Sequence, residues 1–135
     1  MRKIAIVTGA SRGLGRGIAL TLAKEGGFKV YSTARNGMAL DELSIEASKN
    51  ETGGVVVPYV LDQNDDAAVE QFVSIVIANE GKIDTLVNSA YGGLVAIAPH
   101  FGKPFWERPT AVFDEAMNIG VRSSYVMSKF VAPVM

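Results

Sequence analysis

Residues 8–15, with the sequence TGASRGLG, have the residue types needed to bind an anion. Glycine lets the backbone turn sharply and approach a ligand closely. A β-branched run, Ile4 to Thr8, precedes this turn and a helical apolar pattern follows it, so its N–H groups and the helix dipole favour phosphate. We predict that the turn binds a pyrophosphate through the following residues: Gly9, Ser11, Gly13, Leu14 and Gly15. The alternative is a turn that only joins a strand to a helix.

The spacing TGxxxGxG resembles the short-chain dehydrogenase/reductase family. It differs from the general dinucleotide motif GxGxxG and from GxxxxGK[ST], so a P-loop nucleotidase is disfavoured. Further segments resemble the family in the same order along the chain: Asp62, Asn88-Ser89-Ala90, Asn118 and Pro133-x-Met135. Ser89 and Tyr91 depart from the usual Asn-Asn-Ala-Gly.

The resemblance implies roles for these residues. It places Asp62 against the adenine ring, Asn88 and Ala90 beside the cofactor, and Asn118 in support of a catalytic lysine. Asn118 is therefore the one predicted contributor to catalysis, since the family's serine, tyrosine and lysine follow a further strand. Tyr125 and Lys129 have the Tyr-x-x-x-Lys spacing, but they fall in the same predicted helix as Asn118 and are interpreted as structural.

The end of the second predicted strand bears on the choice of cofactor. A carboxylate there would bind the ribose 2′-hydroxyl and repel a 2′-phosphate. The chain has Arg35 instead, and Arg12 lies in the glycine turn. Guanidinium groups pair with phosphate through two parallel hydrogen bonds. We predict NADP(H), with NAD(H) as the second candidate. The alternative is two solvated arginines.

Residues 91–109 form a long segment rich in glycine, proline and aromatic residues. Its length resembles one branch of the family, which implies a small carbonyl or alcohol substrate such as a steroid or xenobiotic. Long loops in compact domains are often functional. The alternative for Phe105 and Trp106 is that they pack the loop against the core.

Apolar runs and helical patterns alternate along the chain. The expected strands are Ile4 to Thr8, Phe28 to Thr33, Val55 to Leu61 and Ile83 to Asn88, and the expected helices are Leu14 to Lys24, Met38 to Lys49, Ala67 to Glu80 and Thr110 to Met135. Such alternation predicts an α/β, Rossmann-type, doubly wound parallel sheet in the order 3-2-1-4. Pro58 favours an edge position for the third strand. Residues 1–135 are interpreted as one incomplete NAD(P)-binding domain, truncated before the catalytic tyrosine.

Composition excludes several functions. The net charge of −1 disfavours nucleic-acid binding, and the absence of cysteine together with a single histidine disfavours a metal site. No apolar run is long enough for a transmembrane segment. We expect an intracellular protein, cytoplasmic by default. Association with endoplasmic reticulum or mitochondria, and a homo-oligomer for the full-length protein, are implied only by the resemblance.

The sequence is therefore compatible with three functions. The first is an NADP(H)-dependent oxidoreductase of the carbonyl reductase or alcohol dehydrogenase type, represented by its cofactor-binding half. The second is a non-catalytic fragment that binds nucleotide or pairs with a full-length relative. The third is a methyltransferase dependent on S-adenosylmethionine, which Arg35 disfavours because such enzymes usually carry an acid after the second strand.

Overall fold

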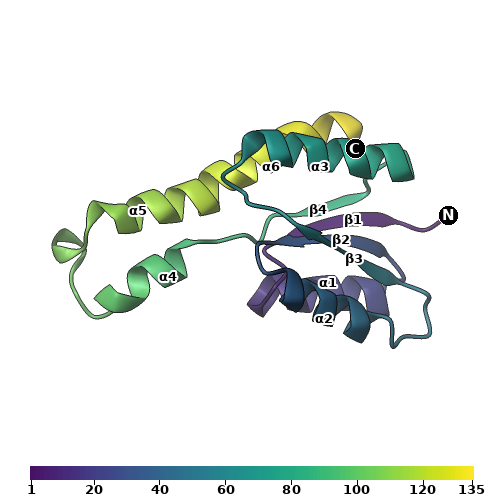
Figure 1. The fold of residues 1–135 in the computed structure, drawn as a ribbon, viewed down its shortest axis with the longest axis horizontal. Coiled ribbons are helices and arrows are strands. Elements are labelled where there is room, and N and C mark those ends of the chain that lie inside the picture. The colour runs from purple at the N-terminus through teal and green to yellow at the C-terminus, as the bar shows by residue number, and fades with distance from the viewer.

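A four-stranded parallel sheet forms the centre of the molecule, in the computed structural model of residues 1–135 (Figure 1). The strands lie in the order β3-β2-β1-β4, as predicted. Their bounds are β1 (Ile4–Thr8), β2 (Lys29–Ala34), β3 (Val55–Val60) and β4 (Thr85–Val87). The prediction that Pro58 marks an edge strand is confirmed, because β3 pairs only with β2.

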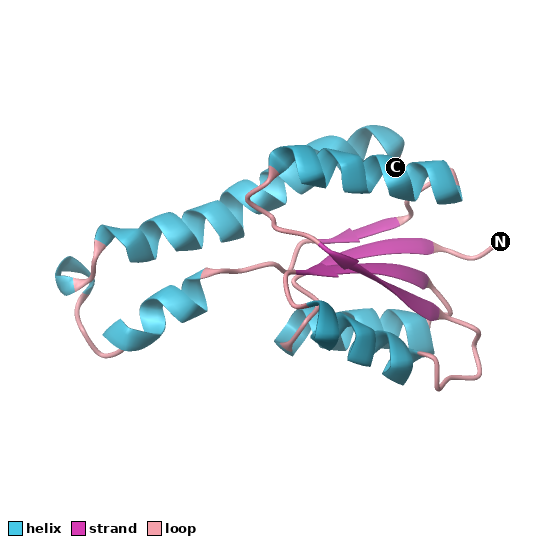
Figure 2. Cartoon of the chain, in the orientation of Figure 1, coloured by secondary structure: helices cyan, strands magenta, loops and turns pink.

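Helices cover both faces of the sheet (Figure 2). The helices are α1 (Gly13–Lys24), α2 (Gly37–Ala47), α3 (Asp66–Glu80), α4 (Gly93–Ile97), α5 (Thr110–Ala116) and α6 (Ser123–Val131). One core cluster joins β1 and β2 to α1 and α2, and a second joins the sheet to α3 and α6. Burial of β1 on both faces explains its uninterrupted apolar sequence.

Local sequence sets the ends of two helices. The Asp65 side chain caps α3 by accepting a hydrogen bond from the Ala68 N–H at 3.0 Å, and Asn36 caps α2 in the same way through Ala39. Gly81 ends α3 in the left-handed conformation, with φ 73°. These signals explain why the predicted bounds of both helices are close to those observed.

The C-terminal third differs from the predictions in two respects. Residues 91–109 are not one irregular loop, because they contain α4 and two 3₁₀ turns, Ala98–His100 and Phe105–Glu107. The single helix expected from Thr110 onward is interrupted by a π-helical segment, Met117–Arg122, between α5 and α6. A π-helical turn is a local insertion that does not end the helix, so no helix-stop residue marks it in the sequence.

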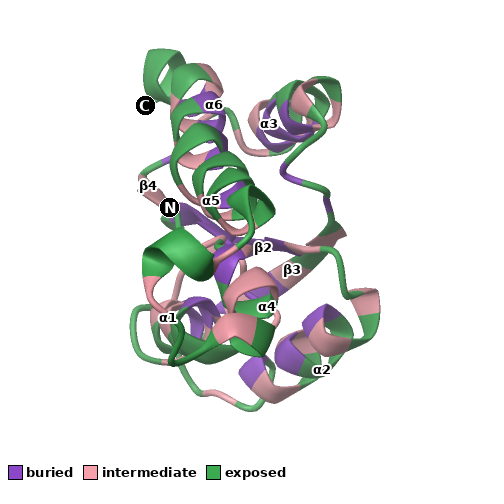
Figure 3. Cartoon of the chain, turned by 90° about the vertical axis from the view of Figure 1, so that its left-hand side faces the viewer, coloured by how far each residue is buried: buried purple, intermediate pink, exposed green.

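We call residues 91–116 the arm, since α4 and α5 extend away from the sheet (Figure 1). Apart from Gly93, no residue of α4 or α5 is buried, and the ribbon of α5 is mostly green, the colour of exposed residues, in Figure 3. Phe113 and Val121, two apolar residues of the helix expected from Thr110 onward, are largely exposed. Core packing of Phe105 and Trp106 is wrong: they contact each other edge to face and are 78% and 73% exposed. Nor is Tyr125 a core residue, since it is 69% exposed.

Candidate functional site: a cleft at the carboxyl ends of the strands

A cleft of about 750 Å³ lies where the carboxyl ends of β1, β2 and β3 meet the segment after β4. In open parallel α/β sheets this edge is the usual site of ligand binding. The cleft brings together nearly all the predicted cofactor residues: Gly9, Ser11, Arg12, Gly13, Leu14, Gly15, Arg35, Asp62 and Ala90. Four separate parts of the sequence thus contribute to a single surface.

The glycine turn is closely packed on one side and open on the other. A Cβ atom on Gly9 would lie 2.6 Å from Ala90 Cα, and one on Gly15 would lie 2.3 Å from the Gly9 carbonyl oxygen. Gly13, with φ 58°, has no atom within 4 Å of that position. Gly9 therefore lets the turn pack against residues 89–90, and Gly15 lets the start of α1 pack against Gly9. Gly13, in contrast, leaves open space over the start of the helix.

The start of α1 offers donors to that space. Its first backbone hydrogen bond runs from the Arg16 N–H to the Arg12 carbonyl at 3.3 Å, and no side chain caps the helix. The N–H groups of Gly13, Leu14 and Gly15 have no protein acceptor. Free donors at a helix N-terminus are an arrangement that binds phosphate.

The Thr8 hydroxyl fixes the position of the segment after β4. Its oxygen accepts hydrogen bonds from the N–H groups of Ser89 and Ala90, at 3.0 and 3.1 Å. Thr8 is 1% exposed, so this contact is shielded from water. It holds residues 89–90 against the glycine turn, although Ser89 and Tyr91 depart from the expected family sequence.

Two unpaired cations line the cleft. Arg12 and Arg35 are exposed and form none of the four ion pairs in the molecule, which involve Arg16, Lys29, Lys82 and Arg122. No carboxylate is present at the end of β2, where the sequence reads Ala34-Arg35-Asn36. Both guanidinium groups are therefore available to an anionic ligand.

The cleft also contains Asp62 and two residues that the sequence did not single out, Thr33 and Gln63. Asp62 is exposed, and its carboxylate accepts the Asn64 N–H at 2.9 Å. Gln63 donates from Nε2 to Thr33 Oγ1 at 3.4 Å. Both residues could have been predicted from the sequence, because Thr33 lies near the end of the second strand and Gln63 follows the third, next to Asp62.

Residues from the arm and the π-helical segment form another wall of the cleft. Tyr91, Leu94 and Val95 line it together with Ile119. Ile119 is 8% exposed and lies against Gly92, where an added Cβ would be 3.0 Å from its side chain. The sequence missed Ile119 because the interruption of the helix determines which residue faces the cleft.

Two predicted site residues lie outside this cleft. Asn88 donates from Nδ2 to the Ser128 hydroxyl at 3.0 Å, and it thereby joins the end of β4 to α6. Asn118 is exposed within the π-helical segment. Tyr125 and Lys129 are exposed on α6, and neither lines the cleft.

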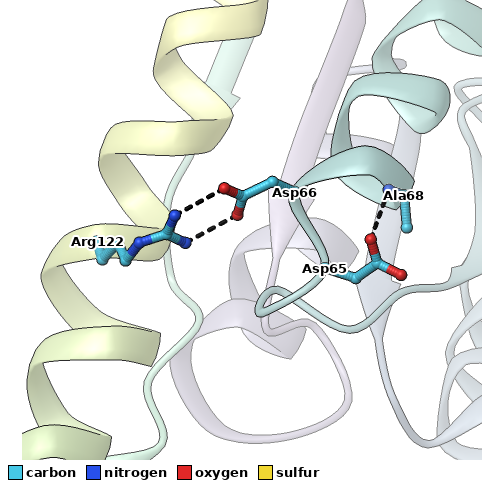
Figure 4. A network of polar contacts seen from close by, with 4 residues as sticks. All are labelled: Asp65, Asp66, Ala68 and Arg122. Atoms are coloured by element: carbon cyan, nitrogen blue, oxygen red, sulfur yellow. Dashed lines mark hydrogen bonds and ion pairs between the residues drawn. The ribbon is translucent and has the colours of Figure 1, made fainter.

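The π-helical segment is tied to the start of α3 by a pair of parallel hydrogen bonds (Figure 4). Arg122 donates to both carboxylate oxygens of Asp66, at 2.8 and 2.6 Å. These bonds lower the pKa of Asp66 and raise that of Arg122. Asp65, the neighbouring residue, caps α3. The contact therefore connects the wall containing Ile119 to the segment containing Asp62 and Gln63.

A family profile described as short chain dehydrogenase matches residues 3–135. The chain belongs to the short-chain dehydrogenase family. This membership confirms the resemblance seen in the sequence and rules out the methyltransferase alternative.

Relatives in the short-chain dehydrogenase family cover almost the whole chain. Dehydrogenase/reductase SDR family member 1 is 41% identical in Mus musculus and 40% identical in Homo sapiens, over 98% of this chain. This is the branch indicated by the length of residues 91–109. The chain spans 42% of the length of both relatives.

Solved structures of the short-chain dehydrogenase family match the fold closely. A metagenomic short-chain oxidoreductase in complex with NADP has a TM-score of 0.84 and 32% identity, covering 98% of this chain and 56% of that one. A 7α-hydroxysteroid dehydrogenase complexed with NADH and 7-oxo glycochenodeoxycholic acid has a TM-score of 0.81 and 33% identity, covering 98% and 48%. The chain thus corresponds to the NAD(P)-binding half of short-chain dehydrogenases. None of its helices has the length and apolar character needed to span a membrane.

Proposed function

We propose that this chain is the cofactor-binding half of an NADP(H)-dependent oxidoreductase of the carbonyl reductase or alcohol dehydrogenase type. One observation supports this most strongly: Arg12 and Arg35 line the cleft without ion-pair partners, beside the free N–H groups that begin α1. The bound nicotinamide would supply hydride transfer, which no side chain can provide.

The residues present fit a dinucleotide phosphate. The space over Gly13 is open, and three N–H groups at the start of α1 have no protein acceptor, so they would be available to a pyrophosphate. A 2′-phosphate beside Arg35 and Arg12 would gain charge-assisted hydrogen bonds, whereas NADH offers no such anion. Ser11 and Leu14 complete this side of the cleft, and Asp62 and Ala90 lie farther along it.

Asn88 and Asn118 have supporting roles in this proposal. Asn88 holds the end of β4 against α6 through Ser128, and so positions Ala90 next to the glycine turn. Asn118 lies in the π-helical segment, two residues after Ala116 ends α5. We propose that it supports the catalytic lysine of the whole protein. The homo-oligomer and the cellular compartment stay predictions.

The substrate class is proposed from the relatives. The names of similar proteins include hydroxysteroid dehydrogenase-like protein 2 from Mus musculus, 32% identical to this chain. A secondary alcohol or the corresponding ketone fits hydride transfer to or from a nicotinamide. The second candidate function, nucleotide binding without turnover, shares the same cleft and differs only in lacking the chemical step.

Cofactor selectivity tests the proposal directly. We expect calorimetric titration to show that the chain binds NADPH more tightly than NADH. Arg35→Asp should weaken NADPH binding by roughly tenfold or more, since it removes a charge-assisted bond and adds repulsion. Lys49→Asp makes the same charge change at an exposed residue just beyond α2 and should leave selectivity unchanged. Unaltered selectivity in Arg35→Asp would contradict the NADP(H) assignment. Failure of the folded chain to bind either nucleotide would contradict the proposed function.

A further inference from the structure

Three large aromatic side chains lie close together in the sequence at the end of the arm. They are Phe101, Phe105 and Trp106, and all three are largely exposed. A single exposed apolar residue is ordinary, but a group of large ones marks a surface that contacts a partner. We call residues 101–108 the tip, and none of them belongs to either core cluster. The three rings therefore contribute nothing to the core of this chain.

The backbone of the tip forms a defined turn that presents these rings. Arg108 donates from Nε to the Lys103 carbonyl oxygen at 2.9 Å, and its backbone N–H donates to the Phe105 carbonyl oxygen at 3.1 Å. Both bonds close the turn within the tip itself. The rings of Phe105 and Trp106 contact each other edge to face, with centroids 5.4 Å apart. The turn thus presents these two rings as a pair.

Positive charge lies beside the aromatic rings. The tip has two cations, Lys103 and Arg108, and one acid, Glu107. Neither cation forms any of the four ion pairs in the molecule. The next acids along the chain, Asp114 and Glu115, come only in the second turn of α5. Exposed rings beside unpaired cations are complementary to a surface that is negative outside and apolar beneath.

The position and size of the tip favour a lipid surface over a protein partner. The turn between α4 and α5 lies at the end of the molecule farthest from the sheet, and both chain ends lie on the side of the sheet (Figure 1). Three aromatic side chains together bury about 450–750 Å² when they are fully covered. A stable protein interface takes about 800 Å² from each partner over a broad surface. A bilayer needs no such area, because each ring can insert separately.

We propose that the tip inserts into the interface of a bilayer that contains anionic phospholipids, with its rings at the apolar boundary and its cations at the lipid phosphates. Tryptophan and phenylalanine are the residues that interfacial segments bury there, and each nearby lysine or arginine adds attraction to anionic lipids. Because Leu94 and Val95 of the arm also line the cleft, insertion of the tip would keep the cleft near the bilayer, a source of apolar small molecules.

Trp106 allows a direct test, because it is the only tryptophan of the chain and its fluorescence reports on the tip alone. The chain, with folding verified by circular dichroism, is mixed with vesicles of phosphatidylcholine alone or of phosphatidylcholine and phosphatidylserine in equal parts. We expect the emission to move to shorter wavelength and to be quenched when the acyl chains carry bromine. Co-sedimentation gives the partition coefficient, which should be higher for the vesicles that contain phosphatidylserine.

A double variant tests the aromatic rings and keeps the fluorescent reporter. Phe101→Ala with Phe105→Ala should lower the partition coefficient by roughly tenfold or more, because membrane affinity scales with the apolar area that is buried. Met38→Ala with Ile45→Ala is the matched control. It also removes two exposed apolar side chains, but from α2, and it should leave the partition coefficient unchanged.

A single variant tests the charge. Lys103→Ala should lower binding to the vesicles with phosphatidylserine by about fivefold and should have little effect on binding to phosphatidylcholine alone. Lys49→Ala removes the same charge from an exposed residue just beyond α2 and should leave both values unchanged. High salt should reduce the difference between Lys103→Ala and the unaltered chain.

Three results would overturn the inference. The first is an absence of quenching by bromine in the folded, unaltered chain, even if that chain sediments with anionic vesicles, because the rings then stay outside the acyl region. The second is an equal loss of partitioning in the two double variants. The third is a shift of the emission without vesicles that grows with protein concentration and is lost in Phe101→Ala with Phe105→Ala, which would assign the tip to a second copy of the chain. The proposed function does not depend on these results, since NADPH binding is measured separately.

Discussion

The sheet with its covering helices and the arm are similarly rich in apolar side chains, but they use them differently. In the sheet and its covering helices, Ile6 and Val7 of β1 and Phe72 of α3 are fully buried. In the arm, Phe101 and Phe113 are 75% and 63% exposed. An apolar side chain stabilises the fold only when another element covers it. The arm has no such element within this chain, so the same residue type should have very different energetic importance in the two regions.

Truncation of one phenylalanine in each region gives the largest expected contrast. Phe72→Ala should lower the free energy of unfolding by about 3–5 kcal/mol, because it removes buried contacts with Tyr31 and Tyr59 and leaves a cavity. Phe105→Ala should change it by less than about 0.5 kcal/mol, since that ring is exposed. Urea denaturation followed by circular dichroism measures both. Equal effects would show that the arm is packed in solution.

A glycine in each region gives the next contrast. Gly9→Ala combines the cost of a left-handed residue with a collision against Ala90, so the free energy of unfolding should fall by about 2–4 kcal/mol. Gly102→Ala, in the arm, also has a positive φ, but the position has open space around it. Its expected cost is about 1–2 kcal/mol. A smaller loss for Gly9→Ala than for Gly102→Ala in the same denaturation experiment would contradict the packing of the glycine turn.

A polar network on the sheet side predicts how stability depends on pH. Glu80 accepts hydrogen bonds from Lys29 at 2.6 Å and from the Tyr31 hydroxyl at 2.6 Å, and these contacts lower its pKa. The pKa of Lys29 is raised, chiefly by the same Glu80 contact, and that of Tyr31 is raised, chiefly by burial. Glu80→Gln should lower the free energy of unfolding near neutral pH by about 1–2 kcal/mol.

The sign of the pH effect follows from these directions. The contribution of Glu80 is complete above the ordinary glutamate pKa and is lost as the pH falls through its lowered pKa. The contributions of Lys29 and Tyr31 are complete below about pH 10 and are lost as the pH rises through their raised pKa values. Thermal unfolding from acid to alkaline pH should therefore show less dependence on pH in Glu80→Gln. An unchanged profile would show that the network does not form.

The contact between Arg122 and Asp66 gives the smallest expected effect. Arg122→Gln should lower the melting temperature only slightly, because both side chains are about half exposed and water competes for their charges. The difference from the unaltered chain should shrink further in high salt. A melting temperature as low as that of Phe72→Ala would show that this ion pair, and not apolar packing, holds the π-helical segment to α3.

Much of the fold and of the site could be predicted because the signals were local. The alternation of apolar strands and amphipathic helices led to the sheet order, and the spacing of Gly9, Gly13 and Gly15 led to the turn. Arg35 and Asp62 were found because each follows a strand, and parallel strands end at the same edge of a sheet. The sheet, the glycine turn and the residues that follow strands could be predicted because short stretches of sequence determine backbone conformation and the places where strands end.

Only the tertiary structure decided the burial of particular side chains. Nothing local to Gln63 indicates that it is buried against Thr33, thirty residues earlier. Likewise, the apolar spacing of Thr110 to Met135 predicts a continuous helix but not the π-helical turn that aims Ile119 at the cleft. The sequence by itself determined the order of elements and the glycine turn at residues 9–15, because these follow from backbone preference. Contacts between distant segments decided which side chains lie in the cleft, because burial depends on what covers a residue.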